Sequence, residues 1–261
     1  MTASDIGPTA GSDQEGFAHG QHHDHAHSHS HRHHVHSHEQ REYASFEEAN
    51  RHHFNETAHQ YNDRPDAQKR AAMLGAAMLA AYKFDENMTT VMDFACGTGL
   101  ISKHLAYSAK SVVGVDISQS MVDQYNRSVN NQGLSPDEMR AVCVGELREN
   151  EEQLNGMTFD VIVCASSYHH FTSIDEVTKA LVSYLKPGGA LLIADLVKDQ
   201  TSHEVFPDNV HHIVAHKGGF SEEDMRSNFE KAGLKNFTFK IVGSAAHAGH
   251  PVSFFLASGD K

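Results

Sequence analysis

Two glycines and an acid in the middle of the chain have the spacing of a nucleotide-binding site. Gly97 and Gly99 lie between an apolar run and a segment with helical periodicity. Glycine lets the backbone turn tightly there and approach a ligand without a Cβ clash. Asp116 ends the next apolar run, 19 residues after Gly97, and a carboxylate in this place can accept hydrogen bonds from both ribose hydroxyls. The sequence therefore predicts a site for a nucleoside-containing cofactor.

Asp93 and Ser102 discriminate between nucleotide cofactors. A dinucleotide-binding fingerprint reads G-x-G-x-x-G, but Ser102 stands at the third glycine position. Asp93 precedes the loop, and an acid there suits a ligand with a cationic amino group, which NAD lacks. An NAD-dependent oxidoreductase is therefore the less favoured alternative.

The elements that must position these residues alternate between β-branched runs and helical segments. Near-continuous apolar runs are typical of parallel strands covered on both faces, and the alternation predicts an α/β fold with a doubly wound sheet. The last two runs leave no room for a helix between them and should pair antiparallel. We expect strands at Val91–Ala95, Ser111–Asp116, Ala141–Gly145, Phe159–Ala165, Ala190–Val197, Phe237–Gly243 and Val252–Ser258, and helices at Leu100–Ala109, Ser118–Asn131 and Ile174–Leu185. The prediction is a mostly parallel, seven-stranded sheet with an antiparallel C-terminal hairpin.

From Phe54 to Phe255 the sequence resembles the class I (seven-stranded, Rossmann-like) S-adenosylmethionine-dependent methyltransferases. The matching motifs are DFACGTG (Asp93–Gly99), VVGVDIS (Val112–Ser118), FDVIVCASSYHHF (Phe159–Phe171) and LKPGGALLIAD (Leu185–Asp195). The first motif of the family usually reads D-x-G-x-G-x-G, so Ala95 replaces its first glycine. The extra methyl group should leave the loop intact. In the last motif we expect Pro187 and the Gly188-Gly189 pair to stop a helix and reverse the chain.

The resemblance implies S-adenosyl-L-methionine as the cofactor and a role for each matching residue. Asp116 would bind the ribose, and Ile117 and Met121 would enclose the adenine. Glu146, at a position where the family often has an acid, would lie near the adenine amino group. Tyr61 belongs to a segment that covers the cofactor in many relatives, although a plain packing role is equally compatible with it. The cofactor-binding residues that we predict are Asp93, Ala95, Cys96, Gly97, Thr98, Gly99, Asp116, Ile117, Met121, Glu146, Leu147 and Tyr61.

Three histidines are the candidate catalytic residues. Methyl transfer from a sulfonium is an in-line displacement, so the protein contributes mainly placement, together with a general base if the acceptor is a hydroxyl or a protonated amine. His169 and His170 follow the expected fourth strand, and His216 lies in the insertion Asp208–Phe220. His170 has the alternative of packing beneath its loop, and His216 shares a face with His212 only if the insertion is helical. This chemistry needs no metal.

Histidine is also concentrated near the N-terminus, where 11 of the 23 histidines lie between His19 and His38. Residues 1–45 have no periodic apolar face, so folding could not offset their backbone entropy. We predict a disordered His-rich tail at 1–45 and one methyltransferase domain at 46–261. Imidazole-rich tracts bind divalent transition metals. The alternatives are metal affinity without a catalytic role and a solvated extension of little consequence.

Composition narrows the range of partners. The formal net charge is −13, which disfavours nucleic acid because its affinity comes largely from Lys and Arg. No apolar run approaches the ~20 residues of a membrane span, and no secretory signal precedes the domain. Three cysteines without a disulfide pattern favour a cytoplasmic protein, and nuclear residence is also compatible. The sequence predicts a small-molecule or protein acceptor, and leaves a non-catalytic methyltransferase-like subunit of a protein complex as an alternative.

Overall fold

The computed structural model describes residues 43–149, 152–198, 206, 208–247 and 250–261. The predictions of a disordered tail and of its metal affinity concern residues 1–45, of which residues 1–42 lie outside the described part of the chain, and both stay predictions. The described residues from Tyr43 onward belong to one compact unit, and the predicted domain bounds of 46–261 stay a prediction. None of the described helices is long and apolar enough to cross a membrane.

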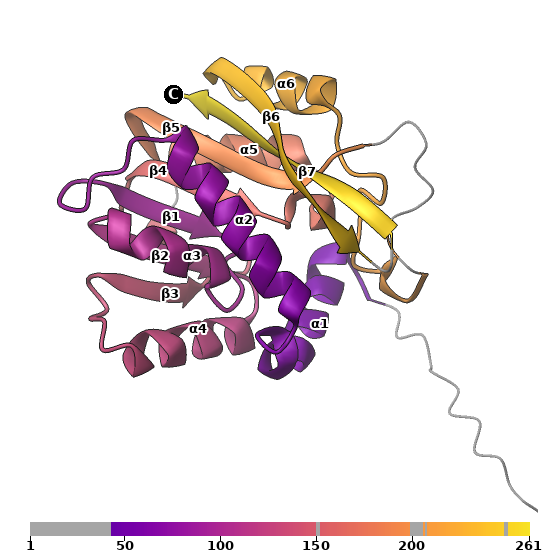
Figure 1. The fold of residues 1–261 in the computed structure, drawn as a ribbon, viewed down its shortest axis with the longest axis horizontal. Helices are drawn as coiled ribbons and strands as arrows, with labels where there is room; N and C mark the ends of the chain where they lie inside the picture. Colours follow the sequence, from indigo (N-terminus) through magenta and orange to yellow (C-terminus); the bar gives the residue numbers. More distant parts are fainter. Residues whose placement is uncertain (1–42, 150–151, 199–205, 207, 248–249) are drawn as a thin grey trace, which may run out of the picture. The chain divides into compact units, whose positions relative to one another are not determined.

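The unit is built on one seven-stranded sheet (Figure 1). In chain order its strands are β1 (Thr90–Phe94), β2 (Ser111–Asp116), β3 (Met139–Cys143), β4 (Phe159–Ala165), β5 (Leu185–Leu196), β6 (Lys235–His247) and β7 (His250–Asp260). The spatial order is β3-β2-β1-β4-β5-β7-β6. The first five strands pair parallel, and β7 pairs antiparallel with both β5 and β6. The predicted α/β sheet with its C-terminal hairpin is confirmed.

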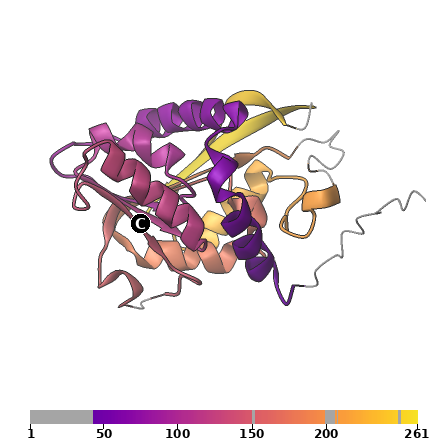
Figure 2. The same ribbon diagram turned by 90° about the horizontal axis from the view of Figure 1, so that it is seen from below.

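Helices cover both faces of this sheet (Figure 2). The helices are α1 (Phe46–Tyr61), α2 (Pro65–Ala81), α3 (Leu100–Leu105), α4 (Gln119–Asn131), α5 (Ile174–Ser183) and α6 (Glu222–Lys231). Successive strand residues face opposite sides, so Val91 and Val112 join one apolar cluster while Met92 and Val113 join the other. The first cluster includes α2, α3 and α4, and the second includes α5 and α6. This two-sided burial explains the near-continuous apolar runs of the strands.

Several element boundaries differ from the prediction. β3 begins and ends two residues earlier than expected, and the hairpin strands β6 and β7 extend further into the segment that joins them. The helix before β5 ends at Ser183, so Pro187 does not stop it, and the Gly188-Gly189 pair lies inside β5. The predicted chain reversal at this pair is wrong. Glycine is needed there because a Cβ on Gly189 would lie 2.9 Å from the carbonyl oxygen of Asp160.

The strand order also fixes where a ligand can bind. β1 has β2 on one side and β4 on the other, so the chain connections leave β1 and β4 in opposite directions. Such a switch point opens a crevice at the carboxyl ends of parallel strands. Asp93, Asp116, Ser166 and Asp195 lie at or just beyond the carboxyl ends of β1, β2, β4 and β5. Residues distant in sequence therefore meet at one edge of the sheet.

The core contact of β7 gives a stability prediction. Phe255 is fully buried, stacks on Phe239 at a centroid distance of 4.6 Å and meets Phe220 edge-on. We expect Phe255→Ala to lower the free energy of unfolding by about 3–5 kcal/mol, measured by urea denaturation. Ile241→Ala on β6, where the side chain is 64% exposed, should change it by less than about 0.5 kcal/mol. Equal effects would mean that β7 is not a central strand.

Candidate active site

The glycine loop between β1 and α3 uses its two glycines for different reasons. Gly97 and Gly99 have φ of 53° and 84°, in the left-handed region where a Cβ is strained. A Cβ on Gly99 would lie 2.6 Å from the Tyr125 ring, whereas a Cβ on Gly97 would meet no atom within 4 Å. Gly99 is thus required by the packing of α4, and Gly97 faces open space. Ala95 also has a positive φ of 55°, so the loop keeps its turn at the cost of strain.

Asp116 connects this loop to the end of β2. Its Oδ2 accepts a hydrogen bond from the Gly97 N–H at 2.8 Å, and its Oδ1 accepts one from the Ser118 N–H at 2.9 Å. Burial raises the pKa of this carboxyl, and the backbone donors partly oppose the shift. The carboxylate is therefore held in one orientation at the wall of a cleft, with lone pairs left for a ribose.

Asp93 is almost fully buried under the loop. Its Oδ2 accepts a hydrogen bond from the Ser102 hydroxyl at 2.6 Å, which explains a serine at the third glycine position. Burial raises the pKa of Asp93 to about 7; the Ser102 hydrogen bond opposes this shift and the charge of Asp116 adds to it. A cation bound beside Asp93 would favour its ionised form.

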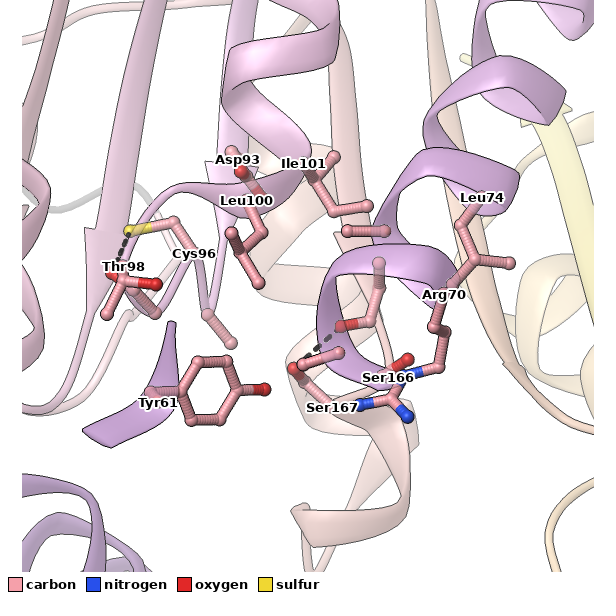
Figure 3. A pocket seen from close by; sticks show the side chains of 15 residues that line it. Tyr61, Arg70, Leu74, Asp93, Cys96, Thr98, Leu100, Ile101, Ser166 and Ser167 are labelled. Atoms are coloured by element: carbon pink, nitrogen blue, oxygen red, sulfur yellow. Dashed lines mark hydrogen bonds between the residues drawn. The ribbon is translucent and has the colours of Figure 1, made fainter. Parts of the chain in front are cut away.

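Asp93 borders a small pocket of about 60 Å³ (Figure 3). Tyr61 at the end of α1 and Arg70 of α2 lie across its opening from the loop. Arg70 makes no ion pair within the described residues; its guanidinium lies 6.0 Å from the Phe254 ring. Ser166, just after β4, has a φ of 55°, and its buried hydroxyl has no hydrogen-bond partner in the described chain. The pocket thus offers an anionic wall and a cationic one.

The pocket opens into a cleft of about 640 Å³, a size typical of small-molecule sites. Tyr61, Arg70, Ala95, Gly97, Ser166 and Ser167 line both spaces. One half of the cleft is lined by Asp116, Ile117, Met121, Gly145, Glu146 and Leu147, and the other by His53, Phe54, Phe94, His169, His170, Phe171, Phe206 and Phe254. The first half contains the residues predicted for the nucleoside, and the second is rich in aromatic side chains.

Three of the predicted cofactor residues have contacts that the sequence did not indicate. Glu146 is exposed and accepts hydrogen bonds from Arg148, the shorter at 2.8 Å, so an adenine would have to compete for its carboxylate. Thr98 donates to Asn62 at 2.6 Å, and the Cys96 thiol points to the Gly97 carbonyl. Burial raises the pKa of the Cys96 thiol far above its ordinary value. Thr98 and Cys96 both line the small pocket.

His169 lines the aromatic half of the cleft and forms a buried pair with Asp195 behind it. The His169 Nδ1 lies 2.8 Å from the Asp195 Oδ1, and the His169 backbone N–H donates to Oδ2. Burial raises the pKa of Asp195, but the imidazole and the N–H groups of Leu196 and His169 outweigh it and lower the pKa overall. Within the described residues no hydrogen bond engages the His169 Nε2. In the sequence Asp195 stands out only as part of a strand motif, although its position at a strand end parallels that of Asp116.

His170 has a different environment from its neighbour. Its Nδ1 lies 2.6 Å from the carbonyl oxygen of Ile213, which fixes the proton on this nitrogen, and its ring meets Phe54 edge-on. Burial lowers the pKa of His170 to about 3, and the charge of His169 adds to the shift. His170 is therefore neutral near pH 7 and ties the β4 loop to the 208–220 insertion.

The insertion approaches the cleft with apolar residues. Only Asp208–Val210 is helical, as a short 3-10 turn, so the predicted shared face of His212 and His216 does not form. His212 is exposed and stacks on Tyr43, and the His216 ring packs on Phe220. Neither lines the cleft, whereas Val210, Ile213 and Val214 do. Within the described residues no group of three His, Cys, Asp or Glu side chains could hold a metal ion.

Comparison with known proteins agrees with this geometry. The family model described as a methyltransferase domain matches residues 49–238. The chain belongs to the methyltransferase-domain family. Its sheet and helices are those of the class I, S-adenosylmethionine-dependent members of that family.

Individual relatives are similar over part of their length. An uncharacterised methyltransferase of Schizosaccharomyces pombe is 38% identical over 161 residues, which is 60% of this chain and 56% of that protein. A ubiquinone biosynthesis O-methyltransferase of Actinobacillus pleuropneumoniae is 26% identical over 106 residues, 41% of this chain and 45% of its own. The chain thus spans about half the length of these curated relatives.

A solved structure with the same fold carries a bound cofactor product. The geranyl diphosphate C-methyltransferase of Streptomyces coelicolor A3(2), in complex with Mg²⁺, geranyl-S-thiolodiphosphate and S-adenosyl-L-homocysteine, has a TM-score of 0.64. It is 12% identical, and the match covers 82% of this chain and 97% of that one. At this identity the likeness concerns the fold alone.

The residues of this methyltransferase domain fit S-adenosyl-L-methionine. Gly97 leaves open space where a Cβ would stand, and Asp116 presents a carboxylate to a ribose. In the small pocket Asp93 would lie on the side of the ammonium group and Arg70 on the side of the carboxylate of a bound methionine end. The sequence did not indicate that Arg70 lines this pocket, because the pattern of Arg and Lys along a helix does not distinguish a ligand-binding arginine from a solvent-exposed one.

The two glycines should respond differently to the same substitution. Gly97→Ala should cost about 1–2 kcal/mol of stability from strain and weaken S-adenosyl-L-methionine binding by about tenfold or more, because the methyl group enters the cofactor space. Gly99→Ala adds a clash with Tyr125 and should destabilise the fold more strongly. Urea denaturation and titration calorimetry separate the two effects. A Gly97→Ala protein with unchanged affinity would contradict this placement of the cofactor.

Asp93 should make cofactor binding depend on pH. The ammonium group pairs with ionised Asp93, so affinity should rise from about pH 5.5 to about pH 7.5 as the carboxyl loses its proton. The raised pKa of Asp93 also makes the stability of the cofactor-free protein depend on pH, in the opposite direction. Stability falls from about pH 4 to about pH 7, because the folded state holds a proton that the unfolded state has lost. Asp93→Asn should remove both dependences.

The matched control is 5′-methylthioadenosine, which lacks the amino-acid portion of the cofactor. Its affinity, measured by the same calorimetric titration, should not follow the Asp93 titration in either protein. An equal pH dependence for both ligands would assign the effect to another group.

Proposed function

We propose that this protein transfers a methyl group from S-adenosyl-L-methionine to an oxygen atom of a small, largely apolar acceptor, with His169 as the general base. The observation that supports it is that His169, backed by the buried Asp195, lines the same cleft as Gly97 and Asp116. The bound cofactor would supply an electrophilic methyl group on a sulfonium.

The chain contributes placement first. Asp116 would bind the ribose, while Asp93 and Arg70 would hold the two charges of the methionine end. Tyr61 lies where the small pocket meets the cleft and would help exclude water from the reacting atoms. Correct orientation of two reactants alone can lower a barrier by roughly 7–11 kcal/mol.

His169 supplies the proton acceptor. Asp195 holds the Nδ1–H of the imidazole, which leaves the Nε2 lone pair for an acceptor in the cleft. The methyl group would pass from sulfur to the acceptor oxygen, with the neutral thioether S-adenosylhomocysteine as the leaving group, while the O–H bond of the acceptor breaks and its proton passes to Nε2. The carboxylate of Asp195 stabilises the resulting imidazolium, and the proton later returns to solvent. A positioned base of this kind contributes typically about 10²–10⁴-fold.

The lining of the cleft and the similarity to relatives support the proposed acceptor class. A hydroxyl acceptor would use the base His169. The cleft around His169 is lined by aromatic side chains, which favour an acceptor molecule that is otherwise apolar; these are Phe94, Phe171, Phe206 and Phe254. The similarity to ubiquinone biosynthesis O-methyltransferases supports oxygen as the methylated atom. A protein acceptor, a protein partner and cytoplasmic residence stay predictions from the sequence.

Removing the base should slow the reaction without weakening cofactor binding. We expect His169→Ala to lower kcat by about 10²–10⁴-fold, measured as release of S-adenosylhomocysteine with hydroxylated naphthalenes as acceptors. Asp195→Asn should lower kcat in the same direction because the imidazole loses its orienting charge. The affinity for S-adenosyl-L-methionine, measured by titration calorimetry, should stay within about threefold of the wild type, since neither side chain contacts the cofactor in this arrangement.

Two controls define what would contradict the proposal. His104→Ala, an exposed histidine of α3, should leave kcat unchanged, and Asp116→Ala should abolish measurable cofactor binding. A protein that binds neither S-adenosyl-L-methionine nor its demethylated product is not this enzyme. Binding without turnover on hydroxyl or amine acceptors would favour the non-catalytic regulatory subunit.

A further inference from the structure

The loop that carries His169 is hydrogen-bonded to a short stretch of the insertion, residues 213–216, which we call the brace. The His169 carbonyl oxygen accepts hydrogen bonds from the backbone N–H groups of Ala215 and His216, each at 2.9 Å. Asp195 holds the same residue from the other side, at its imidazole and its backbone N–H. His169 is therefore fixed by two elements, β5 through Asp195 and the insertion through the brace.

Two side chains hold the brace at one atom. The carbonyl oxygen of Ile213 accepts a hydrogen bond from the His170 Nδ1–H at 2.6 Å and another from the Asn50 Nδ2 at 3.0 Å. Asn50 is only 6% exposed and belongs to α1, which the insertion adjoins (Figure 2). Its Nδ2 also donates to the carbonyl oxygen of Phe46 at 2.8 Å, so the amide ties the brace to the first turn of α1.

The insertion has little regular structure of its own to keep this geometry. Among its described residues, only Asp208–Val210 is helical, as a single 3-10 turn, and segments without a regular hydrogen-bond pattern open more readily than helices or strands. Donors from two different elements fix the position of the Ile213 oxygen. Without either donor the brace and the His169 loop should shift together, and a displacement of about 1 Å can cost about 10²-fold in rate.

We infer that Asn50 and His170 are positioning residues for the general base: through the Ile213 carbonyl they hold the brace, and the brace holds His169 against the reacting hydroxyl. This inference rests on the proposed function and adds the residues that orient its base. Neither side chain has to touch the acceptor for this role. Helix α1 thereby contributes to the reaction rate although none of its groups takes the proton.

The experiment compares two acceptors that differ in their need for a base, on the full-length protein. In 2-naphthol the hydroxyl keeps its proton at neutral pH, like a tyrosine side chain with a pKa of about 10. In heptafluoro-2-naphthol the fluorine atoms withdraw charge, so the hydroxyl is already ionised at neutral pH. A misplaced base should therefore slow methylation of 2-naphthol and spare the fluorinated compound. His169→Ala is the reference and should show this difference.

Asn50→Leu removes the amide donor and keeps a side chain of similar size. It should lower kcat for 2-naphthol by about tenfold or more and kcat for the fluorinated naphthol by less than about threefold. The matched control is Thr57→Val. Thr57 makes the same kind of bond within α1, to the His53 carbonyl at 2.9 Å, and no hydrogen bond links it to the brace within the described residues. This control should leave both rates unchanged.

His170 gives an independent pair of variants, which keeps the test valid if Asn50→Leu does not fold. His170→Phe retains a flat ring and loses the donor, whereas His170→Asn places an N–H close to the position of Nδ1. The first should show the same selective loss on 2-naphthol. The second should bring kcat back to within about threefold of the wild type.

Each outcome decides a separate question. Equal losses on both acceptors in Asn50→Leu and His170→Phe would mean a merely structural role and overturn the inference, and so would undiminished rates in both variants. Equal losses in His169→Ala would instead overturn the base and with it the proposed function.

A readout without turnover covers a protein that methylates neither compound. His169 is carbethoxylated with diethylpyrocarbonate and the modified peptide is quantified by mass spectrometry. The reaction should be about threefold or more faster in Asn50→Leu than in the wild type or in Thr57→Val, because the brace no longer holds the loop. Faster modification without any methyl transfer would keep the brace and overturn the proposed function, and an unchanged rate would overturn the brace.

Discussion

Burial of three carboxylates along one edge of the sheet is the constraint on which the rest of the site depends. Asp93, Asp116 and Asp195 are each less than 10% exposed, and an unpaired charge in such a place is costly. Each receives its own donors from a neighbouring element: the Ser102 hydroxyl, the N–H groups of the glycine loop and of α4, and the His169 imidazole. The hydrogen bonds that stabilise the three buried carboxylates therefore also fix the glycine loop, the start of α4 and the β4–α5 connection.

These donors are not equally effective, and the difference gives each acid its chemistry. Asp195 has a histidine and two backbone N–H groups, so its pKa stays low despite burial. Asp93 has one hydroxyl and a neighbouring negative charge, so its pKa rises to about 7. The first acid can orient and stabilise a cationic imidazole permanently. The burial of the Asp93 carboxylate is only partly offset by hydrogen bonds in the free protein, so this site favours a ligand that carries a positive charge.

Helix α1 covers this edge by polar contacts more than by apolar burial. Its buried residues are two alanines and Asn50. Its side-chain hydrogen bonds join Asn55 to Ser118 and Ser120, Asn62 to Thr98 through the following turn, Glu47 to Thr172, and Asn50 to Ile213. An element held in this way can separate at lower cost than a core helix. It contacts both halves of the cleft, so the same helix can respond to the cofactor and to the acceptor.

The sequence predicted the parts of the site that are close together in the chain. Gly97, Gly99 and Asp116 form one strand–loop–strand unit, and local periodicity was enough to place them. The partners of His169 and Asp93 are long-range or side-chain specific, and no single-sequence signal marks Arg70 as lining a pocket or Asn50 as bonding to Ile213. The prediction for His212 and His216 depended on a helix that Asp208–Phe220 does not form. The role predicted for Pro187 was wrong because α5 already ends at Ser183, where the N–H of the C-cap residue Tyr184 bonds to the carbonyls of Leu181 and Val182.

The adjacent histidines show why residue type alone could not assign the base. His169 and His170 follow the same strand, and both lie at the cleft. The Nδ1 of His169 meets a carboxylate, which tolerates and stabilises a protonated ring. The Nδ1 of His170 meets a carbonyl in an apolar setting, so the ring stays neutral at its lowered pKa. Two identical side chains thus take different roles because their partners, contributed by β5 and by the 208–220 insertion, differ in charge. The choice of His169 as the proposed general base rests on the tertiary fold, because the sequence alone only limits the candidates in this loop to two adjacent histidines.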